Sequence, residues 1–212
     1  DRKRKVKTMT GNTVIVERPA SFSAESVRKI IAMLKTQTRR VAKFKPRSPG
    51  LNMGFSGLVS GCYCTDVQRT GWVLRSRGAG GCWNDRTFPL KCRYGVPGDR
   101  IWVREAYAKA GGYYRYPATD DVHELRKIIP PHLMPRAASR LILEVLQVRV
   151  ERLWNITDEE AKAEGVPRAN PEIELLGEYR IGFQAGWDLL NANRGFPWAS
   201  NPWVFAVDFK LA

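Results

Sequence analysis

Several motifs that mark common classes of protein are missing from this sequence. No apolar run approaches the roughly 20 residues needed to cross a bilayer, and no apolar segment of a secretion signal follows the charged N-terminal residues. The phosphate loop G-x-x-x-x-G-K-[ST], the dinucleotide fingerprint G-x-G-x-x-G, the nucleophile elbow G-x-S-x-G and the zinc-protease motif H-E-x-x-H are absent. We therefore expect a cytoplasmic protein without membrane contact, outside the classes that these motifs define.

Residues that bind metals are scarce. The only two histidines, His123 and His132, have no metal-ligand spacing around them, so we expect both to be structural. The four cysteines fall in one glycine-rich window of 31 residues, with a spacing that differs from paired CxxC knuckles. No cofactor is required, and two interpretations stay open: a zinc site with four thiolate ligands, and four independent reduced thiols. The cysteines are Cys62, Cys64, Cys82 and Cys92.

Positive charge is what the sequence has in excess. The net charge is +14, and residues 1–50 hold 14 Lys/Arg against 3 Asp/Glu, which gives them +11 of it. A one-sided basic field favours polyanions, most often nucleic acid. We expect residues 1–12 to be a flexible basic tail, in which Arg2–Lys7 alone has no specific partner. The N-terminal quarter as a whole predicts a nucleic-acid or nucleotide partner.

A predicted amphipathic helix over residues 23–35 leads into the most distinctive segment of the chain. Ser23 is a good N-cap, and an apolar face follows at helical spacing. Its members are Val27, Ile30, Ile31 and Leu34. The next segment, Lys35–Arg40, has the sequence KTQTRR, with three basic groups and two hydroxyls. Such a cluster can hold a phosphate or, with a carboxylate from elsewhere, transfer protons, whereas Lys35 alone can also be a helix-end charge.

Strands are predicted over residues 13–16, 100–107, 141–153 and 203–209, and Pro19 is expected to end the first. The third strand alternates, with one set of side chains on each face. The two sets are Leu146, Val148 and Val150, and Gln147, Arg149 and Glu151. The length of this strand suggests that it bends around a barrel and is shared by two halves of a sheet.

Residues 43–93 are interpreted as an insertion in a single domain that spans residues 13–212. Glycines recur there too densely for a helix, and Trp72–Leu74 is predicted as one strand of a hairpin. Trp72, Trp83 and Phe88 lie among several arginines. Two interpretations stay open: a platform that stacks bases and neutralises phosphates, and a small satellite core.

Two helices are predicted in the C-terminal third. Residues 172–190 carry a rough apolar stripe. Its members are Ile173, Leu176, Phe183, Trp187 and Leu190. A shorter helix begins with a capping box of Thr157 and Glu160 and stops at Gly165. Glu164 therefore sits at the negative end of a helix, where an acid is unfavourable. Residues that conflict with local structural preferences in this way are concentrated at functional sites. The alternative is a solvated surface glutamate, which would also tolerate the position.

The order of these signals resembles the ASCH domain family of the PUA-like superfamily, in the longer version found in bacteriophages and prophages. The resemblance covers most of the chain outside residues 1–12 and the insertion. It rests on these segments: Lys35–Arg40, Pro97–Glu105, Met134–Arg140, Ala163–Gly165, Phe183–Asp188 and Asn201–Val204. It implies an α+β fold, a small mixed β-barrel flanked by helices with a cleft beside the Lys-Thr segment.

The resemblance also implies two kinds of function. The superfamily includes RNA-binding modules and readers of modified bases. Compact members with similar elements hydrolyse the amide of acetylcytidine, and another member is a ribonuclease. Carried over by motif, Lys35 is the general base, Thr38 the nucleophile, and Glu164 the proton donor or transition-state partner. The nucleic-acid-binding residues are Thr36, Arg39, Arg40 and Arg136.

The chemistry of the segment agrees with either function. A threonine hydroxyl is a poor nucleophile until a base takes its proton, and a lysine becomes a base only if burial or nearby cations, here Arg39 and Arg40, lower its pKa. The high positive charge favours a polymer over a free nucleoside. We expect a protein that binds RNA or a modified nucleobase. The alternatives are a hydrolase in the same cleft, acting as an amidohydrolase or a ribonuclease, and a structural or regulatory phage protein.

Overall fold

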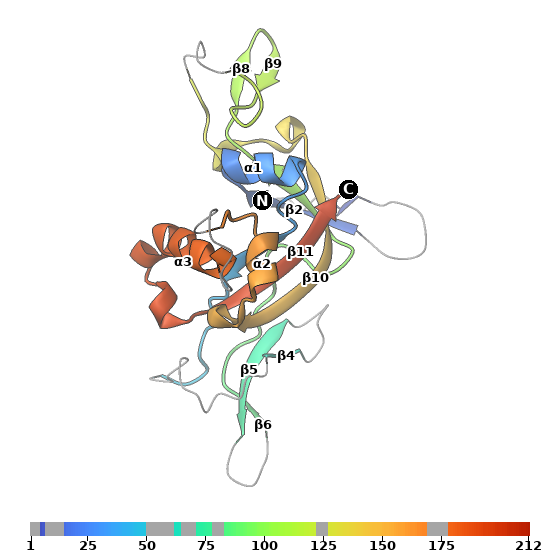
Figure 1. The fold of residues 1–212 in the computed structure, drawn as a ribbon. Coiled ribbons are helices and arrows are strands. Elements are labelled where there is room, and N and C mark those ends of the chain that lie inside the picture. Colours follow the sequence, from blue (N-terminus) through green and yellow to red (C-terminus); the bar gives the residue numbers. More distant parts are fainter. Residues whose placement is uncertain are drawn as a thin grey trace. The chain divides into compact units, whose positions relative to one another are not determined.

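The fold was analysed in a computed structural model, which describes residues 5–6, 15–49, 62–64, 71–77, 83–121, 127–168 and 178–212. The chain divides into two compact units, and each contains strands and a helix (Figure 1). The first unit comprises Asp1–Gln37, Arg93–Gln147 and Asp208–Ala212, and the second comprises Thr38–Cys92 and Val148–Val207. The predicted α+β class is confirmed.

Strands of the first unit pair mainly in antiparallel fashion. β1 (Lys5–Val6) is antiparallel to β2 (Ile15–Ser21), which is parallel to β7 (Arg100–Arg104). β7 in turn pairs with the beginning of β10 (Ile142–Arg152) in antiparallel register. The prediction that Pro19 ends its strand is wrong, because Pro19 lies inside β2, opposite Trp102. Among the described residues only β7 pairs with β2 at this point, and an edge position accepts a residue without an N–H donor.

A turn at Tyr94–Asp99 holds β2 and β7 together. The buried carboxylate of Asp99 accepts hydrogen bonds from the backbone N–H groups of Val16 and Val96, each at 3.1 Å, and pairs with the guanidinium of Arg18. Gly95 has a φ of +110°, and a Cβ there would lie 2.6 Å from the Asp99 carboxylate. Glycine is therefore required beside this carboxylate.

The helix α1 (Ala24–Ile31) is shorter than predicted. The side chain of Ser23 caps it by accepting the Ser26 N–H at 3.2 Å. The helix ends because Met33 takes a left-handed conformation with φ 57°. The N–H groups of Leu34 and Lys35 then both bond to the carbonyl of Lys29, at 2.8 and 3.1 Å. This turn leaves Leu34 exposed, contrary to the predicted apolar stripe, and buries Lys35.

The rest of the first unit is a hairpin and a small core. β8 (Ala108–Ala110) and β9 (Tyr113–Arg115) form the hairpin around two glycines with positive φ. The 3₁₀ helices η2 (Pro131–Leu133) and η3 (Arg136–Ala138) follow. Met134, which follows η2, and Ala138, the last residue of η3, are buried together with Tyr107.

The second unit contains two groups of strands. In the first group, the end of β10 and β11 (Trp203–Leu211) lie side by side, and β3 (Gln37–Val41) pairs with β11 (Figure 1). The second group is an antiparallel sheet of β4 (Cys62–Cys64), β5 (Trp72–Arg77) and β6 (Trp83–Asp85). The predicted strand at Trp72–Leu74 is thereby confirmed. The interpretation of residues 43–93 as an insertion stays a prediction, and parts of that range lie outside the described residues.

The predicted barrel is not formed by the strands that the structure describes. β1 is the last strand on its side in the first unit, and β3 is the last strand on its side in the second, so the ladders do not close. The long strand β10 was expected to bend around a barrel. It belongs instead to an open, mainly antiparallel arrangement, because two separate edges remain at β1 and β3.

The strand β10 changes its buried face near its middle. Leu143 and Val145 are buried, Leu146 and Gln147 are both exposed, and burial resumes at Val148. Two consecutive exposed residues break the period of two. The prediction of one uninterrupted apolar face from Leu146 onward is therefore wrong at Leu146. The break coincides with the boundary between the two units.

Helices of the second unit enclose its core. They are η4 (Leu153–Asn155), α2 (Asp158–Ala163), α3 (Glu178–Asn191), η5 (Ala192–Arg194) and η6 (Trp198–Ser200). The core joins these helices to β11. It contains Leu153, Ile156, Ala161, Phe183, Trp187 and Val204. Residues 172–177 of the predicted helix lie outside the described residues, and Leu190 is exposed, so it does not belong to the buried stripe. No helix in the described ranges is long and apolar enough to cross a membrane.

Candidate functional site

The three residues predicted for catalysis are all buried. Lys35, Thr38 and Glu164 are 7%, 3% and 8% exposed, although each has a polar side chain. Buried polar groups are costly unless other groups satisfy them, so their burial marks constrained positions. Thr38 and Glu164 belong to the second unit and Lys35 to the first. Their convergence into one catalytic site stays a prediction.

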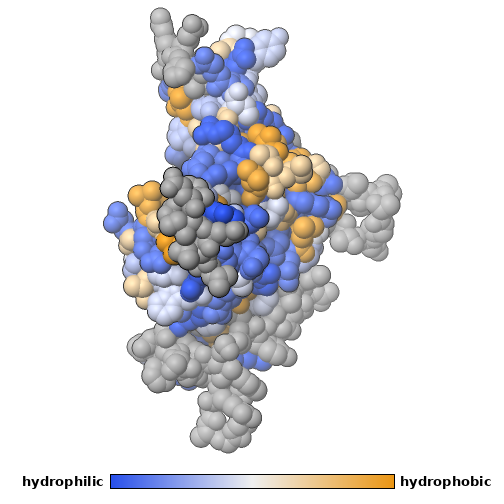
Figure 2. Space-filling model, viewed as in Figure 1, coloured by the Kyte–Doolittle hydropathy of each residue, from blue (hydrophilic) through white to orange (hydrophobic). Residues whose placement is uncertain are grey.

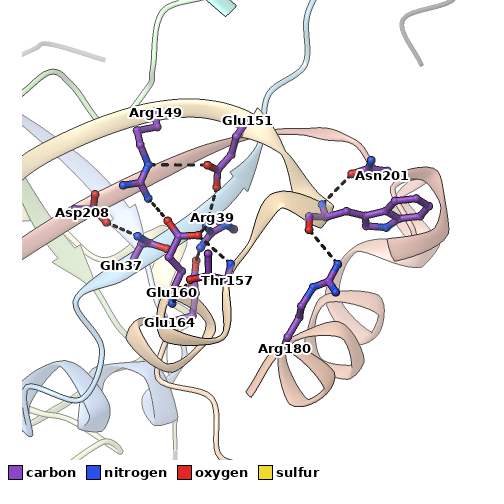
Figure 3. Close-up of polar contacts among 11 residues, drawn as sticks. Gln37, Arg39, Arg149, Glu151, Thr157, Glu160, Glu164, Arg180, Asn201 and Asp208 are labelled. Carbon is purple, nitrogen blue, oxygen red and sulfur yellow. Dashed lines mark hydrogen bonds and ion pairs between the residues drawn. The ribbon is translucent and has the colours of Figure 1, made fainter. Parts of the chain in front are cut away.

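Arg39 lies at the centre of a group of carboxylates (Figure 3). Its side chain is fully buried, and its Nη2 lies 2.7 Å from Glu151 Oε1 and 2.7 Å from Glu160 Oε2. Its Nη1 lies 3.6 Å from Glu164 Oε1. The guanidinium therefore faces acidic groups of the protein, which is the wrong environment for a phosphate.

Arg149 completes this cluster from the solvent side. Its Nη2 lies 2.6 Å from Glu160 Oε1, and its Nε lies 3.9 Å from Glu151 Oε2. The side chain of Arg149 is 32% exposed, whereas that of Arg39 is fully buried. We call these five residues the Arg39 cluster: Arg39, Arg149, Glu151, Glu160 and Glu164. Two guanidinium groups face three carboxylates, so the cluster is net acidic when all are charged.

Regular secondary structure brings the cluster together. Arg149 and Glu151 are two residues apart on β10, so they share a face of that strand. Glu160 and Glu164 are four residues apart on α2 and at its C-cap, so they share a face of the helix. Arg39 on β3 meets both pairs.

Glu160 has two structural tasks. Its backbone N–H donates to Thr157 Oγ1 at 3.2 Å, and its Oε2 accepts the Thr157 N–H at 3.2 Å, which is the predicted capping box. The same Oε2 accepts from Arg39 Nη2. The capping box thus fixes the carboxylate that binds Arg39.

The unfavourable position of Glu164 at the end of α2 is offset by a guanidinium from β3. Glu164 is the C-cap of α2, and Gly165 follows with φ 76°, as the predicted helix stop requires. A carboxylate at this end of a helix is destabilising by a few tenths of a kcal/mol to about 1 kcal/mol. The guanidinium of Arg39 at 3.6 Å supplies the opposing charge.

The other predicted nucleic-acid-binding residues lie in different surroundings. Thr36 is exposed, and Arg40 is partly buried. In the first unit, Arg136 donates from Nε to Glu17 Oε2 at 2.9 Å and lies 6.0 Å from the ring centre of Trp102. A second guanidinium, that of Arg104, lies 4.6 Å from the same ring. These contacts place a cationic pair around one aromatic ring.

Sequence reasoning missed the partners of Arg39. Glu151 and Arg149 stood in the alternating pattern of β10, and Glu160 in the capping box. These signals assigned each residue to a polar face or a helix start, but not to a shared contact. The fold places β3, β10 and α2 next to one another, and this brings Glu151 and Glu160 into contact with Arg39 and Arg149 into contact with Glu160.

The zinc prediction is untested at most of its residues. Cys92 is buried, whereas the side chains of Cys62, Cys64 and Cys82 lie outside the described part of the chain, as does His123. Within the described ranges, no three His, Cys, Asp or Glu residues form a group that could hold a metal ion. The zinc site stays a prediction.

An exposed aromatic ring with two cations lies in the second unit. Phe88 is 46% exposed, Lys45 Nζ lies 5.8 Å from its ring centre, and the Arg47 guanidinium lies 5.2 Å from it. The N–H of Phe88 donates to the carbonyl of Lys45 at 2.9 Å, which fixes the two segments side by side. We call these three residues the Phe88 platform. Such a platform can stack a base and attract its phosphates.

Comparison with known proteins adds no assignment. No family model, no curated protein and no solved structure matches the chain. The resemblance to the ASCH domain family therefore rests on the motifs quoted above.

Proposed function

We propose that this protein binds single-stranded nucleic acid, RNA or a strand with a modified base, as an ASCH-type protein of the PUA-like superfamily that acts in the cytoplasm. The net charge of +14 provides the general attraction for phosphates. Hydrophilic residues predominate on the face seen in Figure 2, and hydrophobic residues gather in a few patches. A polyanion suits such a surface better than a large apolar partner does.

The observation that carries this proposal is the Phe88 platform. Both cations, Lys45 and Arg47, are exposed, and so is the ring that they lie beside. The Arg47 guanidinium also approaches Asp85, with 3.8 Å between Nη2 and Oδ2. An exposed aromatic ring with cations beside it suits a ligand that is planar and anionic. A nucleotide has both properties.

The Arg39 cluster has a different role in this proposal. Its acidic excess would repel phosphate, so Arg39 acts as the internal counter-ion that fixes β3 against β10 and α2. Thr36 and Arg40 remain the candidates for ligand contact in the Lys35–Arg40 segment. The proposal thus moves anion binding away from Arg39, which the sequence alone favoured.

Fluorescence anisotropy with a labelled single-stranded RNA tests the proposal. Wild-type protein is expected to bind, and Phe88→Ala should weaken binding by about 5- to 100-fold, the range for loss of one stacked base. Leu189→Ala is the matched control, because Leu189 is an exposed apolar residue on α3 without an aromatic ring. Binding that Phe88→Ala leaves unchanged would remove the platform from the proposal.

A hydrolase is the second candidate, and the burial of Lys35, Thr38 and Glu164 favours it. Incubation of the protein with acetylcytidine and with labelled RNA, followed by chromatography, would detect cytidine with acetate or shorter RNA. Thr38→Val and Glu164→Gln should then abolish turnover. Equal product from these variants and wild type would show that the activity, if present, belongs to another site.

A further inference from the structure

The second unit contains an open pocket that none of the predicted site residues lines. Its volume is about 270 Å³. The wall is built from the end of β3, the end of β10, the turn after η5 and the start of β11. Its larger side chains are Phe44, Arg152, Phe196 and Trp203. Three aromatic rings and one guanidinium thus surround one small space.

Backbone contacts hold these walls in place. The indole N–H of Trp187, which is buried in the core, donates to the carbonyl of Phe196 at 2.9 Å. Arg152 Nη1 donates to the carbonyl of Asn201 at 2.8 Å, next to the first residues of β11. The N–H of Ala42 donates to the carbonyl of Trp203 at 2.8 Å. The pocket is therefore built on fixed elements.

The rings of the pocket are paired with cations. Lys43 Nζ lies 5.2 Å from the ring centre of Phe196, and the Arg152 guanidinium lies 4.8 Å from that of Trp203. Phe44 meets Trp203 edge to face, with 6.5 Å between ring centres. Lys43 is exposed, and Phe44 and Phe196 are partly exposed, so both ring surface and positive charge are accessible.

Size and charge together select the occupant. Pockets for drug-sized ligands have about 300–1,000 Å³, so this pocket suits a single ring system. An apolar protein side chain would fill the space but would gain nothing from Lys43, whose Nζ lies 5.2 Å from the ring centre of Phe196. A base with its phosphate uses both the aromatic walls and the cation.

We propose that this pocket binds one unstacked nucleobase, with the attached phosphate at Lys43. The choice of ligand rests on the proposed function, because the nucleic acid that supplies the base is the one proposed there. The Phe88 platform would stack a base at one exposed ring, whereas this open pocket would hold a base against several aromatic side chains. It is therefore the place where the identity of a base, including a modified base, can be read.

Calorimetric titration of the full chain with cytidine 5′-monophosphate, adenosine 5′-monophosphate and cytidine tests the proposal. Wild-type protein should bind at least one nucleotide with 1:1 stoichiometry, and Phe196→Ala should weaken binding by about 5- to 100-fold. Phe196→Leu keeps an apolar side chain without the ring, and it should weaken binding as well. Tyr113→Ala, at an exposed ring in the first unit, is the matched control and should bind like wild type.

The role of Lys43 can be tested separately, by comparing the affinity for a nucleotide with the affinity for its nucleoside. Wild-type protein should bind cytidine 5′-monophosphate more tightly than cytidine, and Lys43→Gln should remove most of that difference. Thermal denaturation of each variant shows whether it is folded. Equal binding of the two ligands by wild type, or an unchanged difference in Lys43→Gln, would overturn the assignment of the phosphate.

The binding results distinguish an error in the pocket proposal from an error in the proposed function. Salt-sensitive RNA binding that Phe196→Ala leaves intact, with no mononucleotide bound, would overturn the pocket proposal alone. Mononucleotide binding that depends on Phe196, without any RNA binding, would support the pocket and contradict the proposed function. Binding of N-acetyltryptophanamide in place of any mononucleotide, lost in Phe196→Ala, would overturn the proposal in favour of a protein side chain as occupant.

Discussion

Arg39 shows how burial changes the meaning of a charged residue. In the sequence it is one of three cations in Lys35–Arg40, and a phosphate is the natural partner for such a group. In the fold its side chain has no exposed surface, and the carboxylates of Glu151 and Glu160 lie 2.7 Å away. A buried cation of this kind is required by its partners, because without it Arg149 would be the one cation of the Arg39 cluster beside three carboxylates.

Replacement of Arg39 by methionine should therefore be strongly destabilising. Loss of one partner from a buried ion pair costs about 3–5 kcal/mol, and the partial exposure of Glu151 and Glu160 favours the lower end of that range. Urea denaturation measures the free energy of unfolding. Lys210→Met is the control, because Lys210 is 58% exposed in its pair with Glu144, and such pairs contribute about 0–1 kcal/mol. Equal losses in the two variants would contradict the structural role of Arg39.

Tyr116 gives a prediction about pH. Burial raises the pKa of the Tyr116 phenol above its ordinary value of 10.0, and the cation of Arg140 opposes this shift. The hydroxyl donates to the carbonyl of Ala138 at 2.7 Å. The folded protein thus keeps this proton at a pH where the unfolded chain releases it. The stability linked to Tyr116 is complete below about pH 10 and is lost as the pH rises from there through the pKa of the folded state.

Tyr116→Phe removes this proton and should flatten the alkaline loss of stability. Urea denaturation at about pH 9 and about pH 11 measures it, and the free energy of unfolding should fall less in Tyr116→Phe than in wild type. Tyr113→Phe is the matched control, because Tyr113 is 75% exposed, and it should follow wild type. The same fall in all three proteins would show that Tyr116 titrates alike in the folded and unfolded chain.

At the scale of elements, α2 links local capping to the Arg39 cluster. Thr157 caps the helix, and Glu160 completes the capping box while its carboxylate binds Arg39. Thr157→Ala should lower the free energy of unfolding by about 1 kcal/mol, the usual contribution of an N-cap, and Thr157→Ser should keep most of it. Chemical denaturation of both variants measures this. A Thr157→Ala protein as stable as wild type would mean that the cap contributes nothing here.

Elements were predictable where the signal was local. The capping box at Thr157, the stop at Gly165 and the turn at Asp99 depend on neighbouring residues, and the structure contains all three. The errors have non-local causes. Pro19 is accepted within β2 because β2 has no partner on its other side at that residue among the described strands. Met33 ends α1 early because it takes a left-handed conformation, which glycine adopts more readily than methionine does.

At the scale of the whole molecule, charge predicts the class of partner but does not locate its site. The sequence placed positive charge in the N-terminal quarter and gave Glu164 a functional role, and the structure brings Glu164 to Arg39. It also shows an aromatic pocket whose wall residues come from three separate regions of the sequence: residues 41–44, residue 152 and residues 195–203. No spacing rule relates Phe44, Arg152, Phe196 and Trp203, so only the fold could reveal this pocket.

The salt dependence of RNA binding tests the central claim most directly. Dissociation constants for a labelled single-stranded RNA would be measured by anisotropy at several salt concentrations. Each phosphate contact on a single strand contributes about −0.7 to the slope of log K against log salt, so a few contacts should weaken binding by about tenfold or more between about 50 and 200 mM salt. An affinity that does not change with salt, or no binding to any oligonucleotide, would contradict the account.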